Sequence, residues 1–155
     1  MQKLKIFNTR EIKRLREQIT EEFGYFPESD YVYLQNEKDK IFLINKDLVR
    51  IDIKKLRVDK IGLYFAEIKN GNARLSKEGA QLLYKEAKNK LKNIVELDDK
   101  EMKDYFSGID LNKELGEENR FVLLKYKEDV FGCAKYKENT IINFLPKIHR
   151  GEVIL

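Results

Sequence analysis

The only cysteine and the only histidine of the chain, Cys133 and His149, lie close together between residues 131 and 155. A nucleophilic thiol needs a base within reach and an electropositive, accessible setting. Cys133 instead lies in the apolar stretch FGCAKY, which favours a small buried side chain. Nothing in the spacing directs His149 at the sulfur. A small-molecule enzyme that uses this pair is therefore the weakest reading of the sequence.

Other catalytic patterns are missing as well. The sequence contains no G-x-G-x-x-G, no G-x-x-x-x-G-K-[ST] and no H-E-x-x-H motif. A single cysteine excludes an intramolecular disulfide and any zinc site built from several cysteines. We therefore expect a protein that is not an enzyme and that has no cofactor and no metal site.

The terminal segment is basic. Between residues 131 and 150, four Lys and Arg side chains stand against Glu138 alone, a net charge of +3 with histidine neutral. Cations on one face bind phosphates, with an affinity that falls as salt rises. Tyr136 lies between two of these lysines and is the best candidate for stacking on a base, although the sequence favours packing in the core or at its edge for this side chain. The candidate RNA contacts are Lys135, Tyr136, Lys137, Lys147, His149 and Arg150; the alternative is a solvated strand end.

Charge elsewhere is uneven. Residues 1–91 carry 20 Lys and Arg against 14 Asp and Glu, whereas residues 92–155 carry 11 against 13, which together give the net charge of +4. Two further basic clusters, residues 3–16 and 46–60, fit either a phosphate-binding surface or ordinary solvated faces. A polyanionic partner would therefore depend on local patches.

Apolar periodicity outlines the elements of the first part. It predicts a helix over residues 9–23, with Thr9 as N-cap and Gly24 as the stop. Strands are predicted over 31–35, 40–44 and 61–68, and an Asn-Gly turn then leads to a second arm. Ser76 is expected to cap a helix that runs to about Asn89, with Leu82, Leu83 and Ala87 facing inward. Residues 48–58 fit a short helix or a strand.

The pattern changes near residue 91. A strand over 93–97 and a helix over 98–106, with a capping box of Asp98 and Glu101, precede strands over 120–126, 130–136 and 140–145. Short strands joined by tight turns after one helix suggest a partly closed β-barrel. We therefore predict an α+β protein with an α/β domain over 1–91 and a barrel over 92–155. Phe42, Phe65, Phe121 and Phe144 lie in apolar strands and are expected in the core.

The segments MKDYFSGIDL and RFVLLKYKEDVFGCAKYKENTIINFLPKIHR resemble a PUA domain. NFLPKIHR is similar to the N-x-x-P-K-x-x-R ending of the PUA-like tails of Sun/Fmu-family RNA cytosine methyltransferases, here Asn143, Pro146, Lys147 and Arg150. KIFLINKDL and IGLYFAEIKNGNARLSKEGAQLL resemble the α/β pre-PUA domain of Nip7-type ribosome-biogenesis proteins. The two resemblances cover nearly the whole chain.

The resemblance implies RNA binding, to rRNA or tRNA, in ribosome biogenesis or RNA modification. It implies ribosome-assembly or RNA-methyltransferase proteins as further partners. It does not imply catalysis, because the methyltransferases use a Pro-Cys motif and Cys133 follows Gly132. The acidic DLNKELGEEN takes the place of the glycine-rich loop with which many PUA domains face RNA, so the tail is the favoured contact.

Three further expectations complete the prediction. Arg74 and Lys77 flank the start of the second helix and extend the RNA surface, and the helix N-terminus at Ser76 is placed to receive a phosphate. The sequence contains no run of 18 apolar residues and no signal-peptide h-region, so we expect a cytoplasmic protein outside the membrane. The alternative function is a protein-interaction module that docks a partner, such as an RNA-modifying enzyme, without binding RNA.

Overall fold

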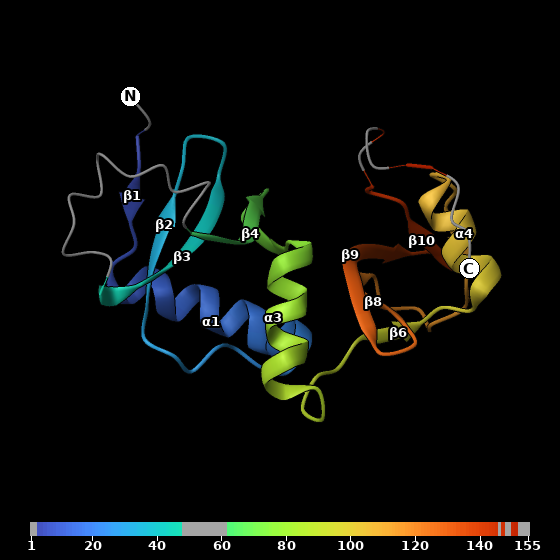
Figure 1. Ribbon diagram of the computed structural model, residues 1–155, viewed down its shortest axis with the longest axis horizontal. Helices are drawn as coiled ribbons and strands as arrows, with labels where there is room; N and C mark the ends of the chain where they lie inside the picture. The colour runs from blue at the N-terminus through green and yellow to red at the C-terminus, as the bar shows by residue number, and fades with distance from the viewer. Residues whose placement is uncertain (1–2, 48–61, 146, 148–149, 152–155) are drawn as a thin grey trace.

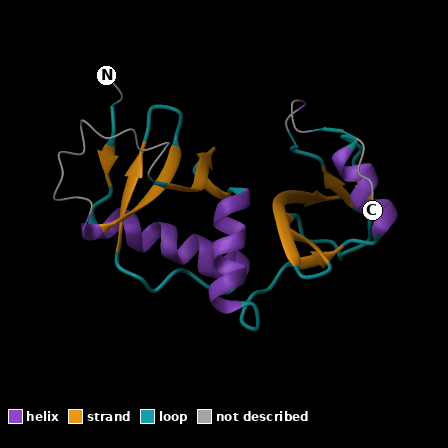
Figure 2. Ribbon diagram, in the orientation of Figure 1, coloured by secondary structure: helices purple, strands orange, loops and turns teal. Residues whose placement is uncertain are grey.

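The computed structural model describes residues 3–47, 62–145, 147 and 150–151. Its first sheet is antiparallel and has the order β1 (Lys5–Ile6), β2 (Tyr31–Gln35), β3 (Lys40–Asn45), β4 (Leu63–Lys69) and β5 (Asn72–Leu75). Helices α1 (Thr9–Phe23) and α3 (Lys77–Ala87) pack on one face of this sheet (Figures 1 and 2). The strands predicted over 31–35, 40–44 and 61–68 appear as β2, β3 and β4, and both predicted helices are confirmed. The helix or strand predicted over 48–58 and most of the basic cluster 46–60 lie outside the described residues.

The second sheet has the order β6 (Ile94–Glu96), β8 (Arg120–Tyr126), β9 (Asp129–Lys137), β10 (Thr140–Ile142) and β7 (Leu111–Asn112). Strand β6 is parallel to β8, and the other neighbours are antiparallel. The sheet curls into a half-barrel with α4 (Asp99–Phe106) beside it (Figure 1). The α+β class and the partly closed barrel are confirmed, whereas the pre-PUA character of the first part and the boundary near residue 91 remain predictions.

Side-chain caps explain where the helices begin. Helix α1 begins after Asn8 rather than Thr9, because the Asn8 Oδ1 accepts the Glu11 N–H at 2.9 Å and the Glu11 Oε1 accepts the Asn8 N–H at 3.1 Å. The predicted caps are confirmed for α3, where Ser76 Oγ accepts the Gly79 N–H at 2.8 Å, and for α4, where Asp98 and Glu101 form a capping box. Helix α3 ends at Ala87, two residues before the predicted end.

Strands β8 and β9 each face two hydrophobic cores. Their outer side chains join a core that also takes in α1, α3 and the first sheet; its members include Phe23, Leu83, Leu123, Val130 and Cys133. Their inner side chains form the core of the half-barrel, with Val122, Leu124, Ala134 and Tyr136. Helix α3 therefore lies between the two sheets (Figure 1), and the side-chain amide of its Gln81 donates to the carbonyl of Val130 at 3.1 Å.

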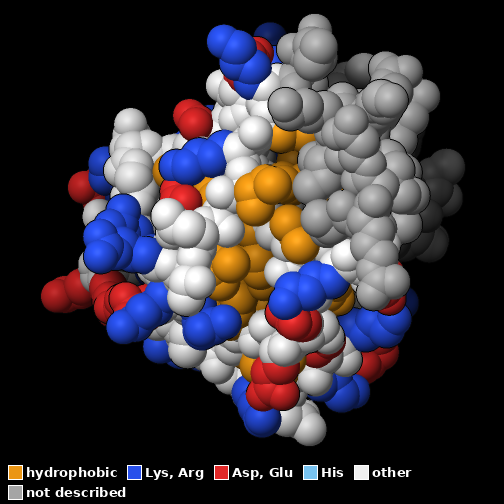
Figure 3. All heavy atoms as spheres, turned by 90° about the vertical axis from the view of Figure 1, so that its left-hand side faces the viewer, with side chains coloured by type: hydrophobic (Ala, Val, Ile, Leu, Met, Phe, Trp, Pro, Cys, Tyr) orange, Lys and Arg blue, Asp and Glu red, His pale blue; other side chains and the backbone are white. Residues whose placement is uncertain are grey.

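The other face of the first sheet carries a third cluster, with Leu34, Phe42 and Ile44 buried and Tyr64 packed against them. Figure 3 looks at the end of the molecule formed by this sheet and shows hydrophobic side chains gathered there, with charges of both signs around them. The predictions for Phe42 and Phe65 are confirmed, since both are buried. No helix in the described part of the chain combines the length and apolarity needed to span a bilayer.

Candidate nucleic-acid interface

A cleft of about 780 Å³ separates the two parts of the molecule. One wall is formed by β4, β5 and the first residues of α3. The other is formed by the end of α4, the middle of β9 and Phe144 and Leu145, which follow β10. Its volume is in the range of pockets that hold small ligands, about 300–1,000 Å³. Because residues from both parts line it, the cleft exists only in the assembled fold.

The first wall of the cleft is cationic. The Arg74 guanidinium lies 4.6 Å from the centroid of the Phe144 ring, and its Nη2 lies 3.7 Å from the Glu67 Oε2. Lys77 is exposed at the rim. Lys40, which the sequence reasoning did not single out, lies with its Nζ 5.2 Å from the centroid of the Tyr64 ring. The structure therefore brings together the predicted Arg74 and Lys77 and adds Lys40.

The segment after β10 follows the other wall. The amide of Asn143 donates to the carbonyls of Tyr105 and Ile109 at 2.6 and 3.1 Å, and its backbone N–H donates to Asp110 Oδ1 at 2.7 Å. Arg150 Nε donates to the carbonyl of Leu145 at 3.0 Å. Asn143 and Arg150 thus hold the tail against the end of α4, which gives a structural reason for two positions of the N-x-x-P-K-x-x-R pattern.

The remaining candidates in the tail have different positions. The Lys147 side chain is exposed, and within the described residues no carboxylate forms an ion pair with it. Arg150 is also exposed, but its side chain packs closely on Gly108, where an added Cβ would lie 2.7 Å from the Arg150 Cδ. The predicted contact His149 lies outside the described residues, as does Pro146. Lys147 is therefore the tail cation best placed to take a phosphate.

The lysines of β9 lie on its outer face. Cys133 lines the cleft, and the outer face of the strand continues from it to Lys135 and Lys137 because side chains alternate along a strand. The Lys135 Nζ lies 4.7 Å from the centroid of the Phe121 ring, and Lys137 is exposed. Phe121, which was expected in the core, is half-buried. These two lysines therefore form a row that leads away from the cleft.

The stacking prediction for Tyr136 is wrong. The alternation that exposes its two lysine neighbours points Tyr136 into the half-barrel, where it is 0% exposed. Its hydroxyl donates to the Gly116 carbonyl at 2.6 Å and accepts the Leu115 N–H at 2.9 Å. The Arg120 guanidinium lies 5.1 Å from the centroid of its ring. Tyr136 therefore holds the 115–116 loop to the barrel and does not offer a ring to RNA.

The core prediction for Phe144 is also wrong. Strand β10 ends at Ile142, and the bonds of Asn143 then turn the chain toward α4, which leaves Phe144 36% exposed at the cleft. Three further rings line the same wall. The centroids of Tyr105 and Phe106 lie 5.7 Å apart, and each lies 5.5 Å from the centroid of Phe131. This aromatic wall, defined as Tyr105, Phe106, Phe131 and Phe144, has no counterpart in the sequence-based prediction.

Cys133 lies in the wall of the cleft but is 8% exposed. Burial raises the pKa of its thiol to about 12, although the positive charge of Arg74 opposes this rise. The thiol is therefore protonated at neutral pH, which argues against a nucleophile. In the described part of the chain, no three His, Cys, Asp or Glu side chains are grouped so as to hold a metal ion.

We expect iodoacetamide to leave Cys133 unmodified in the folded protein at pH 7.5, because the side chain is buried and its thiolate form is scarce. Intact-mass spectrometry measures the adduct after fixed times with and without 8 M urea. The urea-treated sample should gain one adduct within minutes. Equal rates in the two samples would contradict the buried placement and reopen the enzyme alternative.

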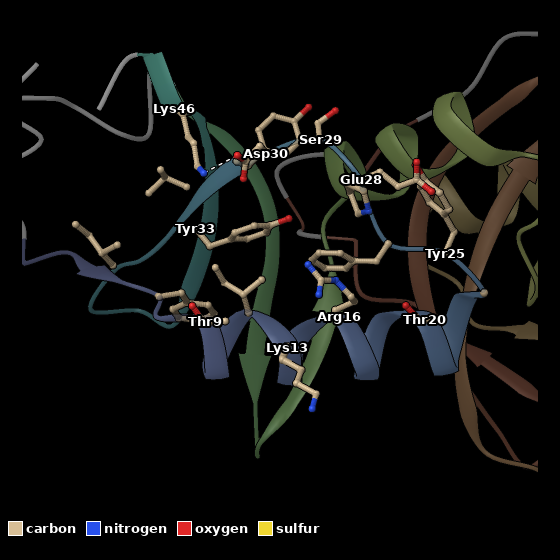
Figure 4. A pocket seen from close by; sticks show the side chains of 18 of the residues that line it. Thr9, Lys13, Arg16, Thr20, Tyr25, Glu28, Ser29, Asp30, Tyr33 and Lys46 are labelled. Carbon is tan, nitrogen blue, oxygen red and sulfur yellow. Dashed lines mark hydrogen bonds and ion pairs between the residues drawn. The ribbon is translucent and has the colours of Figure 1, made fainter. Parts of the chain in front are cut away.

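A second hollow of about 960 Å³ lies between α1 and the segment 24–33 (Figure 4). Arg16 on α1 lies 5.5 Å from the centroid of the Phe26 ring, and the Lys46 Nζ pairs with Asp30 Oδ2 at 2.5 Å. Its lining holds four cations against two carboxylates, whereas the lining of the cleft holds three against two. The charge of the lining therefore does not distinguish the cleft from the second hollow as a candidate RNA site. Both linings also hold five aromatic rings and an arginine over one of them. The cleft differs in its position, because residues from both parts line it and the tail that carries Lys147 begins at its wall.

Residues 92–150 match the family model described as the methyltransferase RsmF PUA domain. The matched region covers the second sheet, α4 and the tail as far as Arg150. It confirms the predicted PUA domain and its relation to the C-terminal region of Sun/Fmu-family methyltransferases, while the Nip7-type resemblance remains a prediction. No curated protein matches the sequence.

Proposed function

Taking residues 92–150 as a PUA domain, we propose that this chain is a non-catalytic RNA-binding protein that acts in ribosome biogenesis or RNA modification. The observation that carries the proposal is the group of cations, Lys40, Arg74 and Lys77, that lines the cleft opposite the PUA domain. All three come from the first part, and the exposed Lys147 of the second part stands two residues after Leu145, which lines the opposite wall. Such cations neutralise phosphates and release counterions.

The geometry favours a polyanion that runs across both parts. Lys135 and Lys137 extend the positive surface along β9 beyond Cys133, and Arg74 and Lys77 stand on the opposite side of the cleft. The Ser76-capped end of α3 also opens here, and a helix N-terminus favours negative charge. A backbone with regularly spaced phosphates fits this spread of cations better than a single small anion.

The non-catalytic part of the proposal is supported by Cys133, whose burial keeps the thiol protonated. The role we assign to the chain is therefore to hold an RNA, as an assembly factor or as the RNA-binding subunit of a separate modifying enzyme. Its partners are rRNA or tRNA together with ribosome-assembly or RNA-methyltransferase proteins. Its place is the cytoplasm.

Salt dependence tests the RNA contact. In filter binding of tRNA or an rRNA fragment, we expect the logarithm of the affinity to fall linearly with the logarithm of the salt concentration, with a slope of several units. Lys77→Gln and Lys147→Gln should each reduce that slope by about 0.7–0.9, the value of one phosphate contact. Arg150 is left unchanged because its side chain holds the tail.

Lys13→Gln provides the matched control, because Lys13 is an exposed lysine that lines the second hollow instead of the cleft. Its slope should equal that of the unmodified protein. A reduced slope for Lys13→Gln with unchanged slopes for the cleft variants would move the RNA site to the second hollow. Absence of salt-dependent binding to either RNA would overturn the proposed function.

The alternative function, a module that docks a protein partner without RNA, makes a different prediction for the same chain. Capture of partners from a lysate by the immobilised protein should be lost after RNase treatment if RNA mediates it. Capture of an RNA-modifying enzyme that survives RNase, together with a flat salt titration, would favour the docking module.

A further inference from the structure

We propose that the cleft binds one unpaired RNA base, stacked against the aromatic wall, so that the RNA recognised is one with a bulged or looped-out nucleotide. This inference rests on the proposed function and deepens it, because it names the form of RNA that the site selects. The evidence is the combination of aromatic rings, one of them exposed, an arginine guanidinium and hydrogen-bond acceptors at one place.

The aromatic wall is accessible at its edge. Phe106 and Phe131 are half-buried, with ring planes inclined by 35° and centroids 5.5 Å apart, so that they form one continuous apolar surface beside Tyr105. Phe144 is one of three large hydrophobic side chains exposed in the described residues. Rings that face a positively charged groove are the usual stacking platforms for bases of single-stranded RNA.

The opposite wall supplies charge and a second planar group. The Arg74 guanidinium already lies 4.6 Å from the centroid of the Phe144 ring, the separation of a stacked cation–π pair. At this separation the two groups are in contact, so a base enters only when Arg74 moves off the ring. The base then stacks on the freed ring with one face and takes the guanidinium on the other, as single-strand binders use arginine. Lys40 holds a similar position over Tyr64, at 5.2 Å.

Acceptors for the edge of a base are also present. Glu67 lines the cleft, with its Oε2 3.7 Å from Arg74 Nη2, and Glu78 lies at the same wall. A carboxylate would repel a phosphate but accepts hydrogen bonds from the N–H groups on the Watson–Crick edge of a base. The two carboxylates thus argue against a site that binds phosphate alone. They favour a site in which the base enters the cleft while the phosphates of the RNA backbone stay outside it, near Lys77 and Lys147.

Paired bases cannot reach this wall, because both of their faces are covered in the helix and their edges are engaged.

The test uses two RNA hairpins of equal length, one fully paired and one with a single bulged 2-aminopurine in its stem. The affinity of the unmodified protein for the bulged hairpin should be about tenfold higher, within the range of about 5- to 150-fold that corresponds to stacking of one base. Stacking should also quench the 2-aminopurine fluorescence.

Phe144→Leu keeps an apolar side chain but removes the ring, and because Phe144 is 36% exposed the substitution leaves the buried cores intact. The ratio between the two affinities should fall toward one, and the quenching should disappear. Ile6→Ala is the matched control, since Ile6 is 54% exposed and lines the second hollow; both readouts should stay as in the unmodified protein.

The outcomes separate the two proposals. Equal, salt-dependent binding of both hairpins without quenching would overturn the base site and leave the RNA-binding function standing. No binding of either hairpin, of tRNA or of the rRNA fragment would overturn both. A preference for the bulge that survives Phe144→Leu would place the unpaired base elsewhere and would also contradict this inference.

Discussion

The Leu123→Ala variant is expected to lose about 2–5 kcal/mol of unfolding free energy, the usual range for a leucine removed from a packed core. Leu123 is 0% exposed and belongs to the core that α1, α3 and the first sheet share with β8 and β9. Because this core spans both parts of the chain, the variant should still unfold in one transition. Urea denaturation followed by far-UV circular dichroism and by tyrosine fluorescence measures both the midpoint and the number of transitions.

Leu124→Ala is the matched variant. Leu124 is the next residue on the same strand, is also 0% exposed, and lies in the core of the half-barrel. We expect a loss of similar size and again a single transition with an unchanged m-value. Two separate transitions in either variant would show that the two parts fold independently, and the cleft between them would then have no fixed geometry.

Gly79→Ala should destabilise the protein by about 1–3 kcal/mol, the typical cost of overpacking. An alanine Cβ at this position would lie 2.1 Å from the carbonyl oxygen of Phe65, so α3 would have to move away from β4. The higher helix propensity of alanine returns only about 1 kcal/mol. Since Ser76 and Lys77 line the cleft from this end of α3, affinity for RNA should fall as well.

Gly151→Ala is the control for Gly79→Ala, because nothing lies within 4 Å of an added Cβ there. Its denaturation midpoint should match that of the unmodified protein. An unchanged midpoint for Gly79→Ala would contradict the close contact between α3 and β4. The same denaturation series serves both variants.

Most of the fold could be predicted because it follows from short-range patterns. Apolar spacing located α1, and alternation with tight turns located β8 and β9. The bounds of α1 match the prediction, but its N-cap is Asn8 rather than Thr9, although Asn8 and Glu11 have the spacing of a capping box. Strands β1 and β7 have two residues each, which is too short for any periodicity, so they form only through their neighbours.

The candidate site was less predictable because its contacts join distant parts of the sequence. The position of Tyr136 was available from alternation, since its neighbours Lys135 and Lys137 cannot share its face. The contact between Arg74 and Phe144 could not be predicted from the sequence. It depends on how the core shared by β8 and α3 brings β5 to the tail. The exposure of Phe144 likewise depends on the bonds that Asn143 makes to the residues after α4.

The ends of the two sheets have a consequence for behaviour at high concentration. The outermost strands β1, β5, β6 and β7 contain two, four, three and two residues. Strand β5 also contacts β9 of the second sheet. Among the described residues, these strands therefore offer other copies of the chain very little bare backbone on which to extend a sheet, which opposes fibrous self-association at high protein concentration.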